Sequence, residues 1–205
     1  IDRTVLLGGP GGGKSTAASF IAFTSSKDIN ARVPFFVVLR DFARDEDLDR
    51  SISTYVEERC AALYQCKPPE GAIEHLLLSG EALVIFDGLD ELIDTSLRRE
   101  VTQRVELFSE RYPLCSALVT SRRVGYDQAQ LDPRMFDTFV LGGFDADDVS
   151  EYVKKWFSSV EELEGADLEL AHANFLSESE TVPPSERRRQ IRWERCPSGR
   201  SGPRS

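Results

Sequence analysis

The sequence has few side chains of the kinds that bind transition metals or form disulfides. Only four cysteines and two histidines occur among its 205 residues. No two cysteines stand at the C-x-x-C spacing of a zinc site. A zinc centre therefore has few candidate ligands, and we expect the cysteines to be reduced thiols, as they are in cytoplasmic proteins.

Long apolar runs are also missing. No stretch approaches the roughly 20 apolar residues that a membrane helix needs, and the first residues do not resemble a signal peptide. The chain opens at Ile1, a few residues before an apolar strand, so we expect it to be a piece of a longer protein. A cytoplasmic location without a membrane partner is the expectation.

Positive charge is in deficit. The chain has 25 lysines and arginines against 35 aspartates and glutamates, a formal net charge of −10. Nucleic acids and anionic membranes attract proteins of the opposite charge, so a dedicated nucleic-acid binder is not favoured. The hydrophobic fraction of 40% is that of a globular protein, and the length suits one α/β domain with a small appendage.

Glycine, by contrast, is concentrated near the N-terminus in the sequence GGPGGGKST, residues 8–16. This stretch fits the phosphate-binding pattern G-x-x-x-x-G-K-[ST]. Apolar residues 5–7 precede it as a strand, and helical spacing follows it, so bound phosphates would meet backbone N–H groups at a helix N-terminus. A plain glycine-rich turn is the much weaker alternative. The predicted phosphate-binding residues are Gly8, Gly9, Pro10, Gly11, Gly12, Gly13, Lys14, Ser15 and Thr16.

Four further apolar runs predict strands, at residues 35–39, 83–86, 117–120 and 138–141. Amphipathic segments predict helices at 48–63, 73–77, 97–108 and 146–157. Strands that alternate with helices predict an α/β fold, a three-layer αβα sandwich around a mainly parallel five-stranded sheet. The continuous run at 35–39 predicts a strand covered on both faces. The charged side chains between Arg98 and Glu106 are assigned to a solvated helix face.

Polar residues follow two of these strands. Asp87, Gly88, Leu89, Asp90 and Glu91 come directly after one, and Ser121 with Arg122 ends another. Because ligands of open parallel sheets bind at the carboxyl ends of the strands, we expect these segments to converge on the glycine-rich loop.

A nucleoside triphosphate with Mg²⁺ requires a cation on the phosphates, a hydroxyl on the metal and a nearby carboxylate. Lys14 meets the first requirement, and Ser15 and Asp87 are the predicted metal ligands. Hydrolysis further requires a group that orients or deprotonates water; Glu91 is the first candidate and Asp90 the second. Arg122 is the predicted cation for charge that develops on the transferred phosphate, ahead of its neighbour Arg123.

The C-terminus differs in composition from the rest. The last 20 residues contain seven arginines against two glutamates and show no hydrophobic period. Residues 183–205 are therefore predicted to form a disordered basic tail. One interpretation is a basic interaction arm; the other, which we favour, is a frameshifted or misjoined end.

Together these motifs resemble the NACHT domain of the STAND class of signal-transduction ATPases, relatives of AAA+ proteins. The resemblance is carried by residues 8–16, 35–44, 83–92, 117–123 and 141–157, and above all by the acidic cluster after Asp87-Gly88. It implies a P-loop NTPase that binds ATP with Mg²⁺ and acts as a slowly hydrolysing switch in innate immunity or bacterial defence. It also implies nucleotide-controlled self-association in the full-length protein.

The resemblance further implies a domain plan. A NACHT-type nucleotide-binding domain would cover residues 1–160, and residues 161–182 would begin a helical region that is truncated here. Family members continue into further helices and a winged helix, which we do not find before the tail. We therefore expect that this chain alone does not switch autonomously.

Other classes of protein stay open. A fast P-loop enzyme such as a small-molecule kinase lacks support, since no lid-like set of arginines occurs. A regulatory GTPase lacks the guanine-reading Asn-Lys-x-Asp motif. A non-catalytic scaffold that folds without switching is the remaining alternative.

Overall fold

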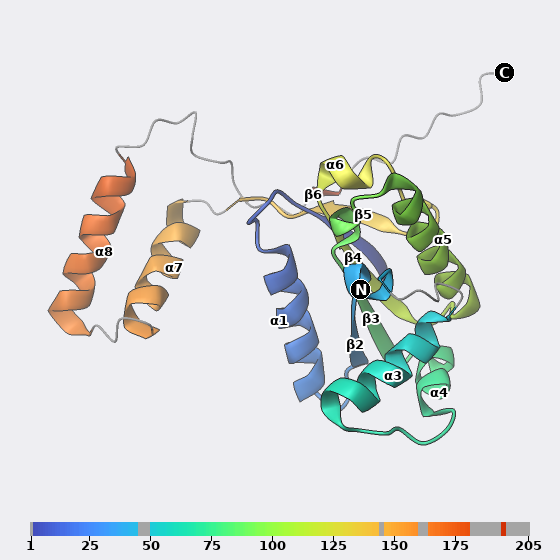
Figure 1. Cartoon of the computed structure of the whole chain (residues 1–205). Helices are drawn as coiled ribbons and strands as arrows, with labels where there is room; N and C mark the ends of the chain where they lie inside the picture. Colours follow the sequence, from blue (N-terminus) through green and yellow to red (C-terminus); the bar gives the residue numbers. More distant parts are fainter. Residues whose placement is uncertain (1, 45–49, 144–145, 160–163, 181–193, 196–205) are drawn as a thin grey trace. The chain divides into compact units, whose positions relative to one another are not determined.

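The structure is a computed structural model that describes residues 2–44, 50–143, 146–159, 164–180 and 194–195. The chain divides into two compact units, one of residues 1–141 with 194–205 and the other of residues 142–193. The first unit holds the sheet and the glycine-rich loop, and the second holds two helices (Figure 1).

The strands are β1 Arg3–Leu7, β2 Val33–Val38, β3 Ala82–Asp87, β4 Ser116–Ser121, β5 Asp137–Val140 and β6 Glu194–Arg195. The helices of the first unit are α1 Lys14–Lys27, α2 Leu39–Phe42, α3 Ile52–Tyr64, α4 Ala72–Ser79, the 3-10 turn η1 Leu89–Glu91, α5 Thr95–Arg111 and α6 Arg123–Tyr126. The second unit contains α7 Ala146–Ser159 and α8 Gly165–Glu180.

The sheet has the strand order β2-β3-β4-β1-β5-β6. Strands β1 to β5 pair in parallel, which confirms the predicted five-stranded parallel sheet. The two-residue strand β6 pairs antiparallel with β5 and was not predicted. It falls inside the segment 183–205 that was predicted to be disordered; the other residues of that segment lie outside the described part of the chain.

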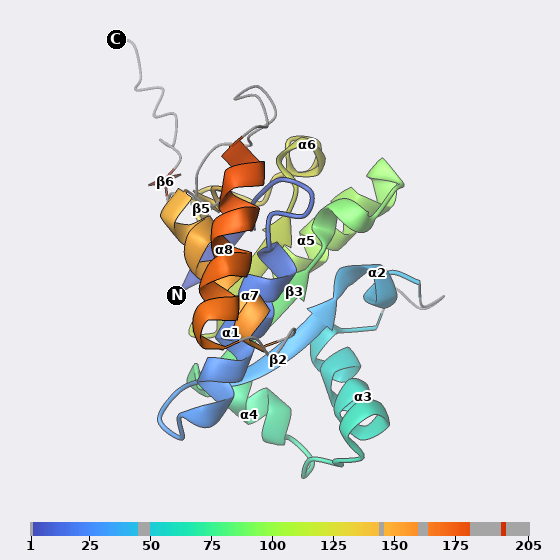
Figure 2. The ribbon, with the colours of Figure 1, turned by 90° about the vertical axis from the view of Figure 1, so that its left-hand side faces the viewer.

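Helices cover both faces of the sheet, α1 on one side and α3, α4 and α5 on the other (Figure 1), and Figure 2 shows the sheet from the side of α1; this confirms the three-layer arrangement. On one face, side chains of β1, β3 and β4 pack against α1, as Leu6, Ile85 and Leu118 do around Ala18. The other face carries the larger core, in which α3, α4 and α5 contribute side chains such as Tyr55, Leu77 and Phe108. Burial of both faces explains why the central strands are continuously apolar.

Strand β2 departs from its prediction, because only one of its faces is fully buried. Phe35 and Val37 are buried, whereas Phe36 and Val38 are only partly buried. The strand lies at the edge of the sheet next to β3, where α1 shields it incompletely. The prediction of a strand covered on both faces was therefore wrong for this strand.

Arg98 also departs from its prediction. It was assigned to the solvated face of a helix, but in α5 its side chain is buried, with 6% exposed. Its neighbour Arg99 is exposed, as predicted. A periodicity argument places polar side chains on the outside, and it fails where the helix packs against another polar segment.

The smaller unit is a pair of packed helices. Ser150 Oγ of α7 lies 2.9 Å from His172 Nε2 of α8, and Lys154 Nζ of α7 lies 3.2 Å from Glu169 Oε1 of α8. These contacts group α7 with α8, so the division in the structure falls after Leu141, whereas the predicted domain boundary stands at residue 160. Among the described helices, none is long and apolar enough to cross a membrane.

Candidate functional site

The glycine-rich loop connects β1 to α1 at the carboxyl end of the sheet. Gly8 N donates to Ser121 O of β4 at 3.2 Å, which ties the loop to the neighbouring strand. Gly11 and Gly13 have φ angles of 67° and 81°, a conformation that residues with a Cβ adopt only with strain. Gly12 N donates to Gly9 O at 3.1 Å and closes the turn. The glycines are thus required by the backbone path.

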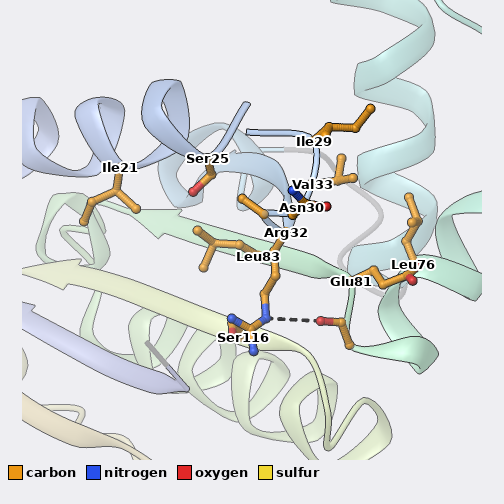
Figure 3. A pocket seen from close by; sticks show the side chains of 12 residues that line it. Ile21, Ser25, Ile29, Asn30, Arg32, Val33, Leu76, Glu81, Leu83 and Ser116 are labelled. Carbon is orange, nitrogen blue, oxygen red and sulfur yellow. Dashed lines mark hydrogen bonds between the residues drawn. The ribbon is translucent and has the colours of Figure 1, made fainter. Parts of the chain in front are cut away.

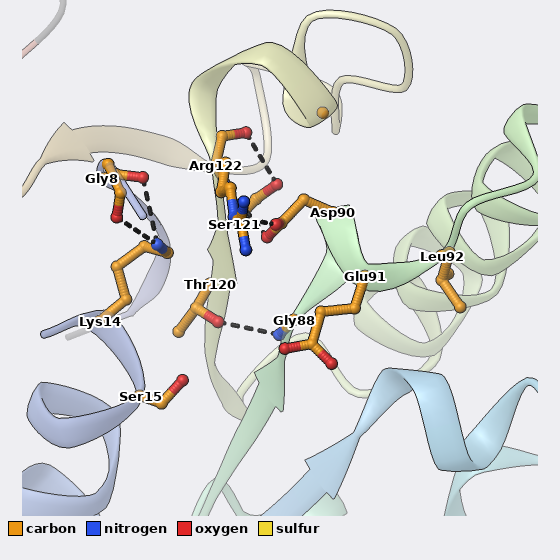
Figure 4. Close-up of polar contacts among 12 residues, drawn as sticks. Gly8, Lys14, Ser15, Gly88, Asp90, Glu91, Leu92, Thr120, Ser121 and Arg122 are labelled. Atoms are coloured by element: carbon orange, nitrogen blue, oxygen red, sulfur yellow. Dashed lines mark hydrogen bonds and ion pairs between the residues drawn. The ribbon is translucent and has the colours of Figure 1, made fainter. Parts of the chain in front are cut away.

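Lys14, the first residue of α1, points back across the loop (Figure 4). Its Nζ donates to Gly8 O at 3.1 Å and to Gly9 O at 3.0 Å. Both acceptors are uncharged carbonyl oxygens, so these two contacts pair the ammonium with no negative charge. Phosphate oxygens would be stronger acceptors than carbonyls for this group.

A chain of hydrogen bonds links α1 to β3 and β4. Ser15 Oγ lies 3.2 Å from Asp87 Oδ1, the last residue of β3. Thr120 Oγ1 donates to the same Oδ1 at 2.6 Å and accepts from Gly88 N at 2.9 Å. Thr120 is buried, with 1% exposed. Because Thr120 fixes one carboxylate oxygen, Asp87 is held in place before any ligand binds.

Asp90 and Arg122 join the turn of residues 87–91, called the acidic turn below, to the end of β4. Asp90 Oδ1 accepts from Arg122 N at 2.8 Å, and Asp90 Oδ2 lies 2.8 Å from Arg122 Nε. The Asp90 side chain is 9% exposed and that of Arg122 is 54% exposed. Asp90 therefore acts as an anchor for Arg122 and leaves much of its guanidinium open to solvent.

Glu91 is less constrained than Asp90. Its Oε2 lies 3.1 Å from Arg40 Nη1 of α2, and both side chains are substantially exposed, 41% and 49%. An exposed ion pair of this kind is weak. Gly88, with φ 83°, allows the turn to fold so tightly that a Cβ there would lie 3.1 Å from Glu91 Cδ. The turn thus directs Glu91 toward the loop without fixing its carboxylate.

These segments enclose a polar cavity of about 300 Å³. It is lined by Pro10, Gly11, Gly12, Gly13, Lys14, Ser15, Thr16, Gly88, Asp90, Glu91, Thr120 and Arg122. Of these lining residues, Pro10 alone is apolar. The lining supplies cations, three hydroxyls and carboxylates, the set that a phosphate chain with a divalent cation requires.

A larger cavity of about 830 Å³ lies at the opposite, amino end of the strands (Figure 3). Its walls include Ile21, Val33, Leu76 and Leu83, and Arg32 Nε there donates to Gly80 O at 3.1 Å. Ser25, Ser116 and Glu81 also line this cavity, but the glycine-rich loop does not. Its size therefore does not make it the better candidate for a phosphate ligand.

The structure brings the predicted site residues together at one end of the sheet. Residues 10–16 line the cavity with Asp90, Glu91 and Arg122, while Asp87 borders it through Ser15. Gly8 and Gly9 stand behind the loop as acceptors for Lys14. Arg123 begins α6 and does not line the cavity.

Three residues with a place in the site were missed. Thr120 was predicted only to be part of a strand. Its position beside Asp87 follows from the strand register, because Phe86 pairs with Val119 and the next residues are Asp87 and Thr120. Arg40 was named only within the segment 35–44 that carries the family resemblance, and Arg98 was assigned to a solvated helix face. Only the packing of α2 and α5 against the acidic turn shows the roles of these two arginines.

The donor set fits a nucleotide with Mg²⁺. Ser15 Oγ and Asp87 Oδ1 are hard oxygen ligands at 3.2 Å from each other, the type that Mg²⁺ prefers. Within the described residues, no three His, Cys, Asp or Glu side chains gather as a self-contained metal site. A magnesium ion here would thus arrive with the phosphates, as in P-loop proteins.

Of the comparisons with known proteins, the family match agrees with this geometry. The sequence model of the NACHT domain matches residues 2–160. No curated protein sequence is detectably similar to the chain. Among solved structures, the DnaC helicase loader is similar with a TM-score of 0.41 and 15% sequence identity, over 68% of this chain and 77% of that one. Since the family match spans more than half of the chain and contains every residue of the cavity, the chain belongs to the NACHT domain family of nucleotide-binding P-loop NTPases.

Proposed function

We propose that the chain is the ATP-binding and slowly ATP-hydrolysing switch module of a longer NACHT-type signalling or defence protein. One observation carries the proposal: the glycine-rich loop, the Ser15–Asp87 pair, Glu91 and Arg122 meet around one polar cavity. The preference for ATP over GTP rests on the family, because the cavity lining contains groups for phosphate and not for a base.

The residues have separate roles in this proposal. Lys14 moves from the Gly8 and Gly9 carbonyls to the phosphate oxygens. Ser15 and Asp87 would hold Mg²⁺, which would neutralise phosphate charge when the nucleotide is bound. Glu91 accepts a proton from the attacking water, and Arg122, anchored by Asp90, stabilises the negative charge that develops on the transferred phosphate.

Slow turnover is supported by the contacts of Glu91. Its Oε2 lies 3.1 Å from Arg40 Nη1, so without nucleotide one oxygen of the carboxylate is directed to Arg40 and not to a water at the loop. A bound nucleotide would then persist long enough to mark a state of the protein. In the longer protein we propose that this state controls self-association through the nucleotide-binding domain, within the plan of residues 1–160 and a helical region from 161.

The test is a titration of the purified protein with ATP, ADP and GTP in the presence of Mg²⁺, together with single-turnover hydrolysis. Lys14→Ala is expected to weaken ATP binding by roughly tenfold to a hundredfold, because a charged hydrogen-bond donor is lost. Glu91→Gln is expected to keep binding and to lose roughly a hundredfold or more in turnover. Matched controls are Lys27→Ala, at the far end of α1, and Glu110→Gln, an exposed acid of α5.

Each alternative class predicts a different result. Tighter binding of GTP than of ATP would contradict the ATP switch, and rapid transfer to a small acceptor would indicate a kinase. Absence of binding to any of the three nucleotides would leave the scaffold. For self-association, sedimentation of the longer protein with ATP and with ADP should give different molecular masses, and equal masses would contradict control by nucleotide.

A further inference from the structure

Arg98 is a buried cation behind the candidate site. It stands in the first turn of α5, where Asp94 caps the helix by accepting from Leu97 N at 2.9 Å. Its side chain is 6% exposed, while Arg99 beside it is exposed. The helix therefore turns this one arginine inward, toward the acidic turn and α6.

The guanidinium of Arg98 bridges the two segments that carry Glu91 and Arg122. Its Nη2 donates to Leu92 O, the residue after Glu91, at 2.5 Å. Its Nη1 donates to Gln128 Oε1 at 2.8 Å and to Gly125 O at 3.3 Å, both beyond Arg122. One planar group thus holds the downstream ends of both segments.

The same two segments are in close contact on the side of the cavity. Asp90 accepts from the backbone N and the Nε of Arg122 at 2.8 Å. A Cβ added to Gly125 would lie 2.6 Å from Asp90 Cβ, so the backbones approach as closely as a glycine permits. The acidic turn and the segment that begins at Arg122 are therefore held together twice, by the Asp90–Arg122 pair on the side of the cavity and by Arg98 on the side away from it.

Arg98 places a charged group at a buried position. Within the described residues, the acceptors of Arg98 are uncharged oxygens, and its Nε has no hydrogen-bond partner. A buried cation without a carboxylate is expensive, and a well-packed apolar side chain often stabilises a core better. What an apolar residue cannot do is bond to two separate segments at once, which the fork of arginine does.

We propose that Arg98 is a positioning residue that sets the spacing between Glu91 and Arg122 and thereby the rate of hydrolysis. It does not line the cavity, so it acts through the two segments that it joins. The proposal rests on the proposed ATPase function for its kinetic part. Its structural part, the coupling of the acidic turn to α6, does not depend on nucleotide.

The experiment compares Arg98→Met and Arg98→Lys with the exposed neighbour Arg99→Met as the matched control. Hydrogen–deuterium exchange is measured without nucleotide on peptides that cover residues 88–92 and 122–128. Both Arg98 variants are expected to exchange faster in both peptides, because neither side chain can bridge the two carbonyls as the fork does. Gly125→Ala, which spreads the same junction and keeps Arg98, gives a second variant should Arg98→Met fold poorly.

The kinetic arm measures ATP affinity and single-turnover hydrolysis well below the melting temperature. We expect an unchanged Kd and a turnover reduced roughly tenfold to a hundredfold for the Arg98 variants and for Gly125→Ala, the penalty of a small misplacement of catalytic groups. In the background of Glu91→Gln, Arg98→Met should lower turnover little further, because both changes act on the same step.

Three outcomes overturn the inference. Unchanged exchange in either peptide removes the coupling, whatever happens with ATP. Faster exchange with unchanged turnover shows that Arg98 serves only folding. Full recovery of turnover and exchange in Arg98→Lys shows that a charge, and not the fork, is sufficient. If the wild type binds no ATP, the proposed function fails by itself, and the exchange arm still decides whether Arg98 couples the two segments.

Discussion

The two ends of the parallel sheet carry cavities of different size and composition. At the carboxyl ends, a cavity of about 300 Å³ is lined almost entirely by polar side chains and glycines. At the amino ends, two larger cavities of about 830 and 640 Å³ are lined by a mixture of apolar side chains, such as Leu76 and Leu114, and charged ones, such as Arg32 and Arg134, and neither is lined by the glycine-rich loop. Chemistry and not volume identifies the site. Changes at the amino end should therefore alter stability alone, and changes at the carboxyl end should alter ligand chemistry.

Gly80→Ala should give the largest loss of stability, at the amino end. Gly80 caps α4 with φ 78°, and a Cβ there would lie 2.8 Å from Leu114 O. Left-handed strain and overpacking together predict a loss of about 2 to 4 kcal/mol in unfolding free energy. Urea denaturation measures it, and ATP affinity at low temperature should stay at the wild-type value.

Gly71→Ala is the matched control for that variant. Gly71 flanks the other end of α4 with φ 77°, but a Cβ there would meet nothing within 4 Å. Only the strain remains, about 1 kcal/mol. Equal losses in the two variants would show that the contact with Leu114 does not matter.

Cys115 should make the amino end sensitive to high pH. Burial of its thiol raises the pKa to about 11 from 9.0. The folded state then holds a proton that the unfolded state releases, so stability is complete below pH 9 and falls by about 2 to 3 kcal/mol between pH 9 and pH 11. Unfolding curves across that range should be flatter with pH in Cys115→Ala than in the wild type or in Cys66→Ala, an exposed cysteine. If the stabilities of the wild type and of Cys115→Ala fall equally between pH 9 and pH 11, the prediction that Cys115 titrates there is wrong.

Thr120→Val tests the carboxyl end with an isosteric change. Asp87 loses the Thr120 hydroxyl and keeps the longer contact with Ser15, and the Gly88 N–H loses its buried acceptor. We expect a loss of about 1 to 3 kcal/mol in stability and a roughly tenfold weaker affinity for Mg²⁺-ATP. Thr4→Val, on β1 away from the cavity, is the control. A loss of stability with full affinity would mean that Asp87 needs no anchor, and the contrast between the two ends would weaken.

Arg40→Gln should have the smallest effect on stability. Its ion pair with Glu91 is exposed, so removing it should change the unfolding free energy by less than about 1 kcal/mol. Turnover should rise by a small factor, because Arg40 no longer directs one oxygen of the Glu91 carboxylate away from the loop. Single-turnover hydrolysis measures this, and Arg44→Gln, an exposed arginine nearby, is the control. A fall in turnover would show instead that Arg40 positions Glu91.

Much of the fold was predictable because the central strands are unambiguous. The strands β1, β3 and β4 are buried on both faces, so each appears as an apolar run bounded by polar residues or glycine. The edge strand β2 misled the prediction, because its apolar run continues although one face is only partly covered. Strand β6 has two residues and no apolar signal, so it was not predictable from its sequence.

The sequence by itself determined the half of the site that is local. Residues 8–16 form the phosphate loop through backbone angles and contacts within a few residues, and such contacts leave a recognisable pattern. The order of Asp87, Asp90 and Glu91 after a strand was equally readable.

Only the tertiary structure decided how the acids are held. Each acid is held by a residue from a distant segment of the chain: Thr120 contacts Asp87, Arg122 contacts Asp90 and Arg40 contacts Glu91. The contacts that Arg98 makes behind them also join distant segments. A periodic pattern reports whether a side chain faces water or a core. It does not report which distant segment packs there, and the roles of these partners depend on that packing.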